Sequence, residues 1–308
     1  MTSASPQPTP IEALEPIVER MRRADWVHAE DAEHRLAQLI YQVCHGRQQI
    51  PERATRALPA DALMDREFAA GLSRANGGIG PRHDSWTVRT IEDDGRLAVE
   101  LDGLMLWIDG QAGASVGDRV AVRLPKEYRN LYPGHYVAIG DADRGTRANP
   151  VRIYWNIGSE GAPVLLEAVT RTFNARNIAF RFKLLSSPRA YTRADAAILY
   201  LPAFHRAEGA ELVRQVYRDV RSIMRTPNSA FVLALAPGLG LAEDPMDGSS
   251  FGLHRSRLIA SMLIAAVHHE EPLSEIASGL EGAGYDLRHF YRNPGSSARY
   301  DDFVVDDV

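Results

Sequence analysis

The sequence contains a single cysteine, Cys44, and only two lysines, Lys126 and Lys183, although lysine and arginine together number 35 in 308 residues. One cysteine excludes a disulfide within the chain and argues against a structural zinc site. The longest apolar run, 258–267, is too short to span a bilayer and predicts a buried helix. The formal net charge of −5 argues against nucleic acid as a main partner, because binding to phosphate backbones usually requires a basic excess.

The first ten residues contain serine, threonine and three prolines and have no apolar core. They therefore do not form a signal peptide, and we expect them to be disordered. With no membrane span and no signal peptide, the protein is expected to be cytoplasmic. A hydrophobic content of 45% and a charged content of 24% are typical of a soluble globular protein with one large domain or two modest ones.

The first half of the chain predicts helices followed by short strands. Apolar residues recur at helical spacing over about 11–24, 29–45 and, more weakly, 61–75. Alternating strands follow at 85–92, 96–102, 104–109, 119–124 and 135–140, separated by turn dipeptides such as Asp102-Gly103. This β-rich stretch predicts a small sheet or barrel. Four histidines of this half are scattered, and we interpret them as surface or packing residues: His28, His34, His45 and His83.

The Gly-, Asp-, Arg- and Pro-rich segment 140–150 predicts a linker, with a boundary near residue 149 between regions 11–148 and 149–308. Beyond it, strands are expected at 151–157, 178–185 and 196–202, and helices at 163–174, 210–225, from the loop at 248–252 to residue 268, and at 273–282. The predicted fold class is α+β. N-terminal helices and a small β-rich subdomain precede an antiparallel or mixed sheet that is flanked by helices.

Lys183 is the residue around which we build a candidate site. Nearly all other positive charge is carried by arginine, which keeps its proton at any accessible pH, whereas a lysine loses its proton when its surroundings lower its pKa. Arg181 lies two residues earlier in the same predicted strand, so both side chains leave the same face of the sheet. Lys183 is therefore a candidate amine base, although a solvated lysine at a strand edge fits the same pattern. We interpret Lys126 as a solvated lysine.

Basic and aromatic residues of the second half supply the rest of the candidate site. Several arginines around one lysine suit a phosphate group, because guanidiniums bind a dianion through paired hydrogen bonds and also lower the pKa of the amine. The Gly/Ser loop at 248–252 leads into a helix whose first N–H groups favour an anion, with Ser250 in a supporting role. The full set is Arg152, Tyr154, Lys183, Tyr191, Arg193, Asp195, Ser250, Arg255 and Arg257. A base and a phosphate clamp, with no metal or other cofactor, indicate β-elimination of phosphate from phosphoserine or phosphothreonine.

Five blocks of the second half resemble the HopA-type type III effector family: 152–157 (RIYWNI), 180–183 (FRFK), 191–200 (YTRADAAILY), 236–245 (APGLGLAEDP) and 250–255 (SFGLHR). The resemblance covers about residues 150–270, and the order of the blocks makes it specific. The stretch from Leu124-Pro125 to Pro133-Gly134-His135-Tyr136 resembles the region that precedes this domain in stand-alone bacterial members. A fainter similarity is to the phosphothreonine lyase effectors, which use a lysine base and a histidine acid.

The resemblance implies the lyase component of a split dehydratase, which acts with a separate kinase-like protein in lanthipeptide and thioamidated-peptide biosynthesis. The expected substrate is a phosphorylated precursor peptide, and the expected partners are that kinase-like protein and, as a further option, a cyclase. The fold is expected to resemble that of phosphothreonine lyases.

The resemblance also implies roles for single residues. It gives Lys183 the position of the base and places Arg193 and Arg255 on the phosphate, with help from Arg152. Asp195 is expected to orient Arg193. Where the lyase effectors have their acid histidine, this sequence has Tyr154, so the general acid is Tyr154, His205, His254 or none.

Two other functions fit the same residues. In one, the pocket is a binding module that holds a phosphopeptide or the kinase partner without turning it over. In the other, the chain is a virulence effector that acts on host proteins. Residues 11–140 are expected to bind peptide or partner, on the ground of their position alone.

Overall fold

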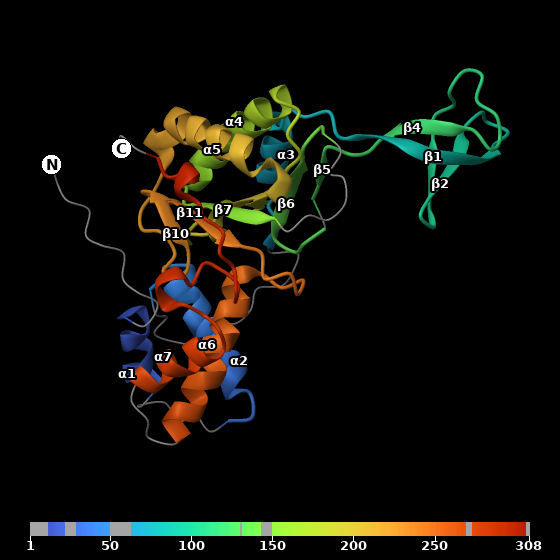
Figure 1. The fold of residues 1–308 in the computed structure, drawn as a ribbon. Coiled ribbons are helices and arrows are strands. Elements are labelled where there is room, and N and C mark those ends of the chain that lie inside the picture. The colour runs from blue at the N-terminus through green and yellow to red at the C-terminus, as the bar shows by residue number, and fades with distance from the viewer. Residues whose placement is uncertain are drawn as a thin grey trace.

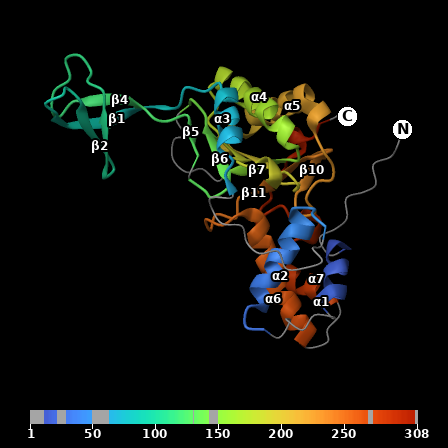
Figure 2. The ribbon, with the colours of Figure 1, turned by 180° about the vertical axis from the view of Figure 1, so that it is seen from behind.

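The protein is described by a computed structural model that covers residues 12–21, 29–49, 63–129, 131–142, 150–268 and 273–305. The first ten residues and position 149, to which the sequence assigns disorder and a domain boundary, lie outside these ranges. A large sheet lies between two groups of helices, and a small sheet projects from one side (Figures 1 and 2).

Within the described residues the large sheet has seven strands, and each strand pairs antiparallel to its neighbours. Its spatial order is β10 (Leu233–Ala236), β11 (Leu239–Glu243), β7 (Val151–Trp155), β9 (Ala197–Leu201), β8 (Arg181–Leu185), β6 (His135–Ile139) and β5 (Glu127–Tyr128). The apolar run of β9 places it in the interior of the sheet, as expected for a strand buried on both faces.

Helices α3 (Arg66–Ala75), α4 (Ala162–Ala175) and α5 (Arg206–Val220) lie on one side of this sheet (Figure 1). The strands send large apolar side chains to a common core with these helices, among them Ile153, Trp155 and Leu199. Local sequence sets the ends of the helices. The Asp65 carboxylate accepts a hydrogen bond from the Phe68 N–H at 2.9 Å and so caps α3 at its N-terminus.

The other side of the sheet carries a second group of helices, α1 (Glu15–Met21), α2 (Ala32–Ile40), α6 (Phe251–His268) and α7 (Leu273–Gly282) (Figures 1 and 2). A five-residue π-helix, η3 (Tyr41–His45), continues α2 directly. Gly252 allows α6 to pack against it, because a Cβ atom at this position would lie 2.2 Å from the His45 ring. Aromatic contacts from His45 and Phe251 to Tyr154 then seat this group against β7.

The small sheet has the order β3 (Leu104–Ile108), β2 (Leu97–Leu101), β1 (Arg82–Ile91) and β4 (Arg119–Arg123). It has its own apolar core, in which Trp86, Val88 and Val99 are almost fully buried. Figures 1 and 2 show that this small sheet projects away from the rest of the molecule. The edge strand β3 leaves Leu104 and Trp107 more than half exposed.

These observations confirm the predicted α+β class and resolve the alternative of an antiparallel or mixed sheet in favour of antiparallel pairing in the described part of the chain. One expectation needs correction, because the strand predicted at 135–140 does not belong to the small sheet. As β6 it pairs with β8, with Val137 opposite Lys183. Strands from both sides of residue 149 therefore share one sheet, and the linker composition there does not divide it. No helix among the described residues is long and apolar enough to cross a membrane.

Candidate active site

Two rows of side chains cross the middle of the sheet on the face opposite α4 and α5. In one row Arg181 of β8, Tyr200 of β9 and Arg152 of β7 lie directly opposite one another. In the next row Lys183, Ile198 and Tyr154 are aligned in the same way. Residues two apart in a strand share a face, so all six side chains belong to one surface.

The first row is a stack of two guanidiniums on one phenol ring. The Arg181 Cζ atom lies 4.1 Å from the centre of the Tyr200 ring, and the Arg152 Cζ atom lies 5.3 Å from it. Arg152 is further fixed by Asp244, whose carboxylate accepts a hydrogen bond from its Nε at 2.8 Å, and by the Ser249 carbonyl at 2.9 Å from its Nη2. The Tyr200 ring therefore lies between the positive charges of Arg181 and Arg152 and separates them across the sheet.

Lys183 is half-buried beside this stack, and burial is the first cause that lowers its pKa, from 10.5 to about 8. The positive charges of Arg193, Arg152 and Arg181 lower the pKa further, while Asp195 opposes them. At pH 7 this change raises the neutral fraction of the amine by roughly 300-fold over an unperturbed lysine. Lys183 therefore has the property required of an amine base, namely a substantial neutral population near neutral pH.

A buried polar network holds the next cation, Arg193. Its Nε donates to Asp195 Oδ1 at 2.6 Å, and its Nη2 donates to both Asp195 Oδ2 and the Tyr41 hydroxyl. The Tyr41 hydroxyl in turn donates to Asp195 at 2.7 Å. Burial alone would raise the pKa of Asp195, but Arg193, His45 and Tyr41 hold it well below its usual range. The predicted role of Asp195 in orienting Arg193 agrees with this geometry.

The π-helix η3 supplies both Tyr41 and His45 to this network. His45 Nε2 lies 3.6 Å from Asp195, its Nδ1 lies 2.8 Å from the Ser229 hydroxyl, and its ring meets Tyr154 edge-on at 5.2 Å. Burial lowers the pKa of His45 to about 4, so the ring is neutral at physiological pH. The sequence interpretation of His45 as a packing residue therefore omits its place beside the site.

Two residues of the segment before and within β6 approach Lys183. The Lys183 Nζ atom lies 5.1 Å from the centre of the Tyr132 ring. The Nδ1 of His135 lies 2.8 Å from the Pro133 carbonyl oxygen, which can only accept, so the ring donates from Nδ1 and its Nε2 is the acceptor. Burial, followed by the charge of Lys183, lowers the pKa of His135 to about 3 and keeps it neutral.

Tyr154 is 3% exposed, and burial raises its pKa above the ordinary value, so the phenol keeps its proton. It lies across Ile198 from Lys183, two strands away on the same face of the sheet. The two histidines considered as alternative acids lie elsewhere. His205 contacts Glu208 after β9, and His254 contacts Arg255 and Asp247 on α6.

Two phosphate ligands predicted from the sequence need correction. Arg255 is 0% exposed, and its guanidinium donates to the Phe290 and Arg292 carbonyls and to Asn293. It therefore ties α6 to the C-terminal segment and is inaccessible to a phosphate. The hydroxyl of Tyr191, which is 4% exposed, donates to the Leu185 carbonyl at 2.8 Å, so this residue braces the end of β8.

The remaining two predicted residues lie at the start of α6, Ser250 directly before the helix and Arg257 in its second turn. Ser250 caps the helix, since its Oγ accepts from the Leu253 N–H at 3.2 Å. Arg257 is exposed and lines a separate hollow, together with Glu33, Asp247 and His254. The structure brings together Arg152, Tyr154, Lys183, Arg193 and Asp195 from the predicted set.

Comparison with known proteins identifies the family. Residues 127–292, more than half of the chain, match the HopA1 effector protein family. The chain belongs to this family. The match begins at β5 and includes both rows of the candidate site. No curated protein matches the sequence significantly.

Two solved structures are similar to this member of the HopA1 family. One is the effector protein from Pseudomonas syringae pv. tomato strain DC3000, with a TM-score of 0.52 and 15% identity over 92% of this chain and 98% of that chain. The other is the effector protein from Pseudomonas syringae pv. syringae strain 61, with a TM-score of 0.50 and 15% identity over 96% and 99% of the two chains. At this identity the likeness establishes a shared fold.

Residues that the sequence reasoning did not include complete the site in this family member. They are Tyr41, His45, Tyr132, His135 and Tyr200, with Arg181 in a larger role than expected. Tyr200 and Arg181 carry a usable signal, because the alternation of β9 and β8 puts both on the face of Lys183. Tyr41 and His45 carry none, since they lie about 150 residues from Asp195 in the chain.

Proposed function

We propose that this HopA1-family protein is a lyase that eliminates phosphate from phosphoserine or phosphothreonine in a peptide. The observation that supports it most strongly is the alignment of Lys183 with Tyr154 next to the Arg181–Tyr200–Arg152 row on one face of the sheet, where burial and the charges of Arg193, Arg152 and Arg181 lower the pKa of Lys183. β-Elimination of phosphate requires a base for the Cα proton and a nearby cationic site for the phosphate dianion.

In the proposed reaction the phosphate lies at Arg181, the half-buried cation at one end of the Arg181–Tyr200–Arg152 stack, and the Cα–H bond of the phosphorylated residue points to Lys183. The neutral Lys183 amine takes the Cα proton, and the electron pair of that bond forms the Cα=Cβ double bond. The bond between Cβ and the phosphate oxygen breaks, and inorganic phosphate leaves with the electron pair of that Cβ–O bond. Phosphoserine gives dehydroalanine, and phosphothreonine gives dehydrobutyrine.

Tyr154 is our proposed general acid. Its buried phenol is protonated and lies on the same face as Lys183, on the far side of Ile198. A proton delivered to the leaving phosphate oxygen from that side would come from the opposite end of the site to the base. His205 and His254 are less well placed, because each contacts a carboxylate outside the two rows.

On the resemblance noted from the sequence, we propose that the reaction belongs to lanthipeptide-type peptide biosynthesis and that a separate kinase-like protein phosphorylates the precursor peptide. A non-catalytic module that binds the phosphopeptide or the kinase is the second candidate. Its support is the fixed pairing of Arg193 with Asp195 and of Arg152 with Asp244, which is typical of a rigid binding site as well as of a catalytic one.

Mass spectrometry of a phosphothreonine peptide incubated with the protein separates these functions. The lyase predicts loss of phosphoric acid from the peptide, and the loss is abolished by Lys183→Ala. A peptide of unchanged mass that nevertheless binds to the protein would refute the lyase and favour the binding module. A dehydrobutyrine product that traps an added thiol distinguishes elimination from hydrolysis, which would leave threonine.

A further inference from the structure

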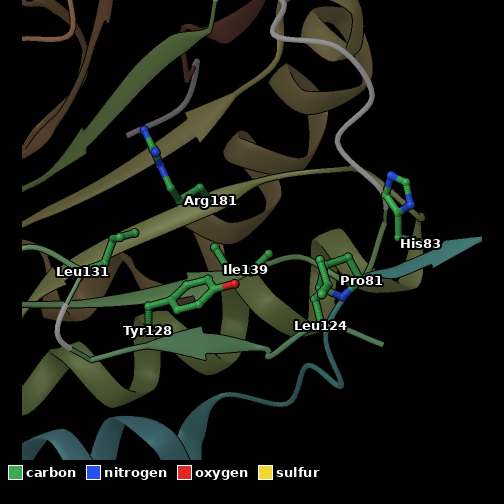
Figure 3. A pocket seen from close by; sticks show the side chains of 7 residues that line it. All are labelled: Pro81, His83, Leu124, Tyr128, Leu131, Ile139 and Arg181. Atoms are coloured by element: carbon green, nitrogen blue, oxygen red, sulfur yellow. The ribbon is translucent and has the colours of Figure 1, made fainter. Parts of the chain in front are cut away.

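An apolar cavity of about 280 Å³ lies beside the candidate active site, on the β5 side of the sheet (Figure 3). Its lining consists of Pro81, His83, Leu124, Tyr128, Leu131, Ile139 and Arg181. In the close view Tyr128 and Ile139 form its middle, with Leu131 on one side and Pro81 and Leu124 on the other. A cavity of this size with mostly aliphatic walls suits an apolar group rather than a charged one.

Two connections join this cavity to Lys183. Arg181 lines the cavity and also stacks on Tyr200, and it lies directly opposite Ile139 of β6. Leu131 lines the cavity, while the next residue, Tyr132, places its ring 5.1 Å from the Lys183 Nζ atom. The cavity and the candidate site are therefore neighbours on the same face of the sheet.

The separation fits the spacing of side chains in a peptide. Ile139 is one strand and two residues away from Lys183, which corresponds to about 8 Å from a strand rise of about 3.3 Å and a strand spacing of about 4.8 Å. An extended peptide covers this distance in two or three residues.

We propose that the cavity is a specificity subsite that takes an aliphatic or aromatic side chain of the peptide, two or three residues from the phosphorylated residue. The inference rests on the proposed lyase function. It makes the preferred substrate a phosphopeptide with an apolar residue at that spacing. Two of the lining residues present apolar surface to solvent, since Leu131 is 51% exposed and Tyr128 is 37% exposed, and a bound side chain would cover both.

A set of synthetic phosphothreonine peptides in an alanine host tests the subsite. One leucine is placed in turn at each position from three residues before to three residues after the phosphothreonine, and an aspartate series serves for comparison. At one position, on one side of the phosphothreonine, burial of leucine should raise kcat/KM on the order of tenfold over the alanine peptide. Aspartate at the same position should lower kcat/KM below that of the alanine peptide.

Two variants link the preference to the cavity. Leu131→Trp fills the entry and is expected to reduce the ratio of kcat/KM between leucine and alanine peptides to about twofold or less. Val164→Trp is the matched control, because Val164 is equally exposed but lies on α4, on the opposite side of the sheet. It is expected to keep the wild-type ratio.

The possible failures are distinguishable. Elimination that proceeds equally with leucine and alanine at every position, or a preference that persists in Leu131→Trp, would refute the subsite and leave the lyase function standing. If no peptide loses phosphate, the lyase proposal fails. The dissociation constants of the same peptides then test whether the cavity binds an apolar side chain. Equal dissociation constants for the leucine and alanine peptides would refute the subsite as well.

Discussion

Removal of the positive charge of Arg181 is expected to change the pH dependence of catalysis through Lys183. The two side chains are two residues apart on β8, a separation of about 7 Å. At that distance two unit charges interact by about 0.6 kcal/mol in water and about 2.4 kcal/mol at an effective dielectric of 20, which is about 0.4 to 1.7 pH units in the pKa of the amine. Arg181 is the weakest of the three arginine contributions, so we expect a shift of about half a unit for Arg181→Met.

The sign follows from the direction of the pKa change. In the wild-type protein kcat/KM should rise about tenfold per pH unit above pH 6.5 and level off near pH 8, where the Lys183 amine becomes neutral. Arg181→Met raises the pKa of Lys183, so the plateau should begin at a higher pH. Activity lost at pH 7 through this route is regained at pH 9.

The assay is the initial rate of phosphate release from a phosphothreonine peptide at low substrate concentration, between pH 6.5 and 9.5. A purely phosphate-binding role of Arg181 would lower kcat/KM by the same factor at every pH and leave the midpoint unchanged. A midpoint for the wild-type protein above pH 10, where an ordinary lysine titrates, would refute the reasoning as a whole.

Three further variants test other parts of the account. Tyr154→Phe should slow elimination by roughly a hundredfold or more if the phenol is the general acid, and an unaffected rate excludes that role. Gly252→Ala should lower the free energy of unfolding by about 2 kcal/mol or more in a urea titration, because its Cβ would lie 2.2 Å from the His45 ring. Gly282→Ala is the control, because a Cβ at that position meets nothing within 4 Å. Arg255→Met should cost about 2–4 kcal/mol of stability, because it leaves buried carbonyls unpaired, and a stable variant that only binds phosphate more weakly would contradict the structural role.

The sequence predicts how most of the candidate site is arranged on one face of the sheet, since local patterns determine that arrangement. The alternation of residues 151–157 puts Arg152 and Tyr154 on one face, and that of 178–185 does the same for Arg181 and Lys183. The apolar run of β9 predicts a strand in the interior of the sheet, and it lies between β7 and β8. With β9 as the shared neighbour, these two patterns suffice to align the arginines and the lysine.

Long-range packing explains what the sequence does not predict. The network around Asp195 depends on Tyr41 and His45, which reach it because α2 continues as a π-helix and because Gly252 lets α6 approach. Arg255 has the residue type of a phosphate ligand, but the C-terminal segment folds over it and provides carbonyl acceptors. No local sequence pattern predicts either arrangement, because the residues in contact are distant in the chain.

The most direct test of the central claim is the rate of phosphate release by Lys183→Arg at pH 8. This variant keeps the positive charge but cannot supply a neutral amine, because arginine remains protonated at any accessible pH. The account predicts a rate at least a hundredfold below wild type, with peptide binding largely retained. Lys126→Arg is the control at the other lysine, which is not the solvated lysine expected from the sequence, because its Nζ donates to the Asn76 carbonyl at 2.7 Å; arginine can also donate there, so we expect a rate close to wild type. A Lys183→Arg variant that releases phosphate at the wild-type rate would contradict Lys183 as the base.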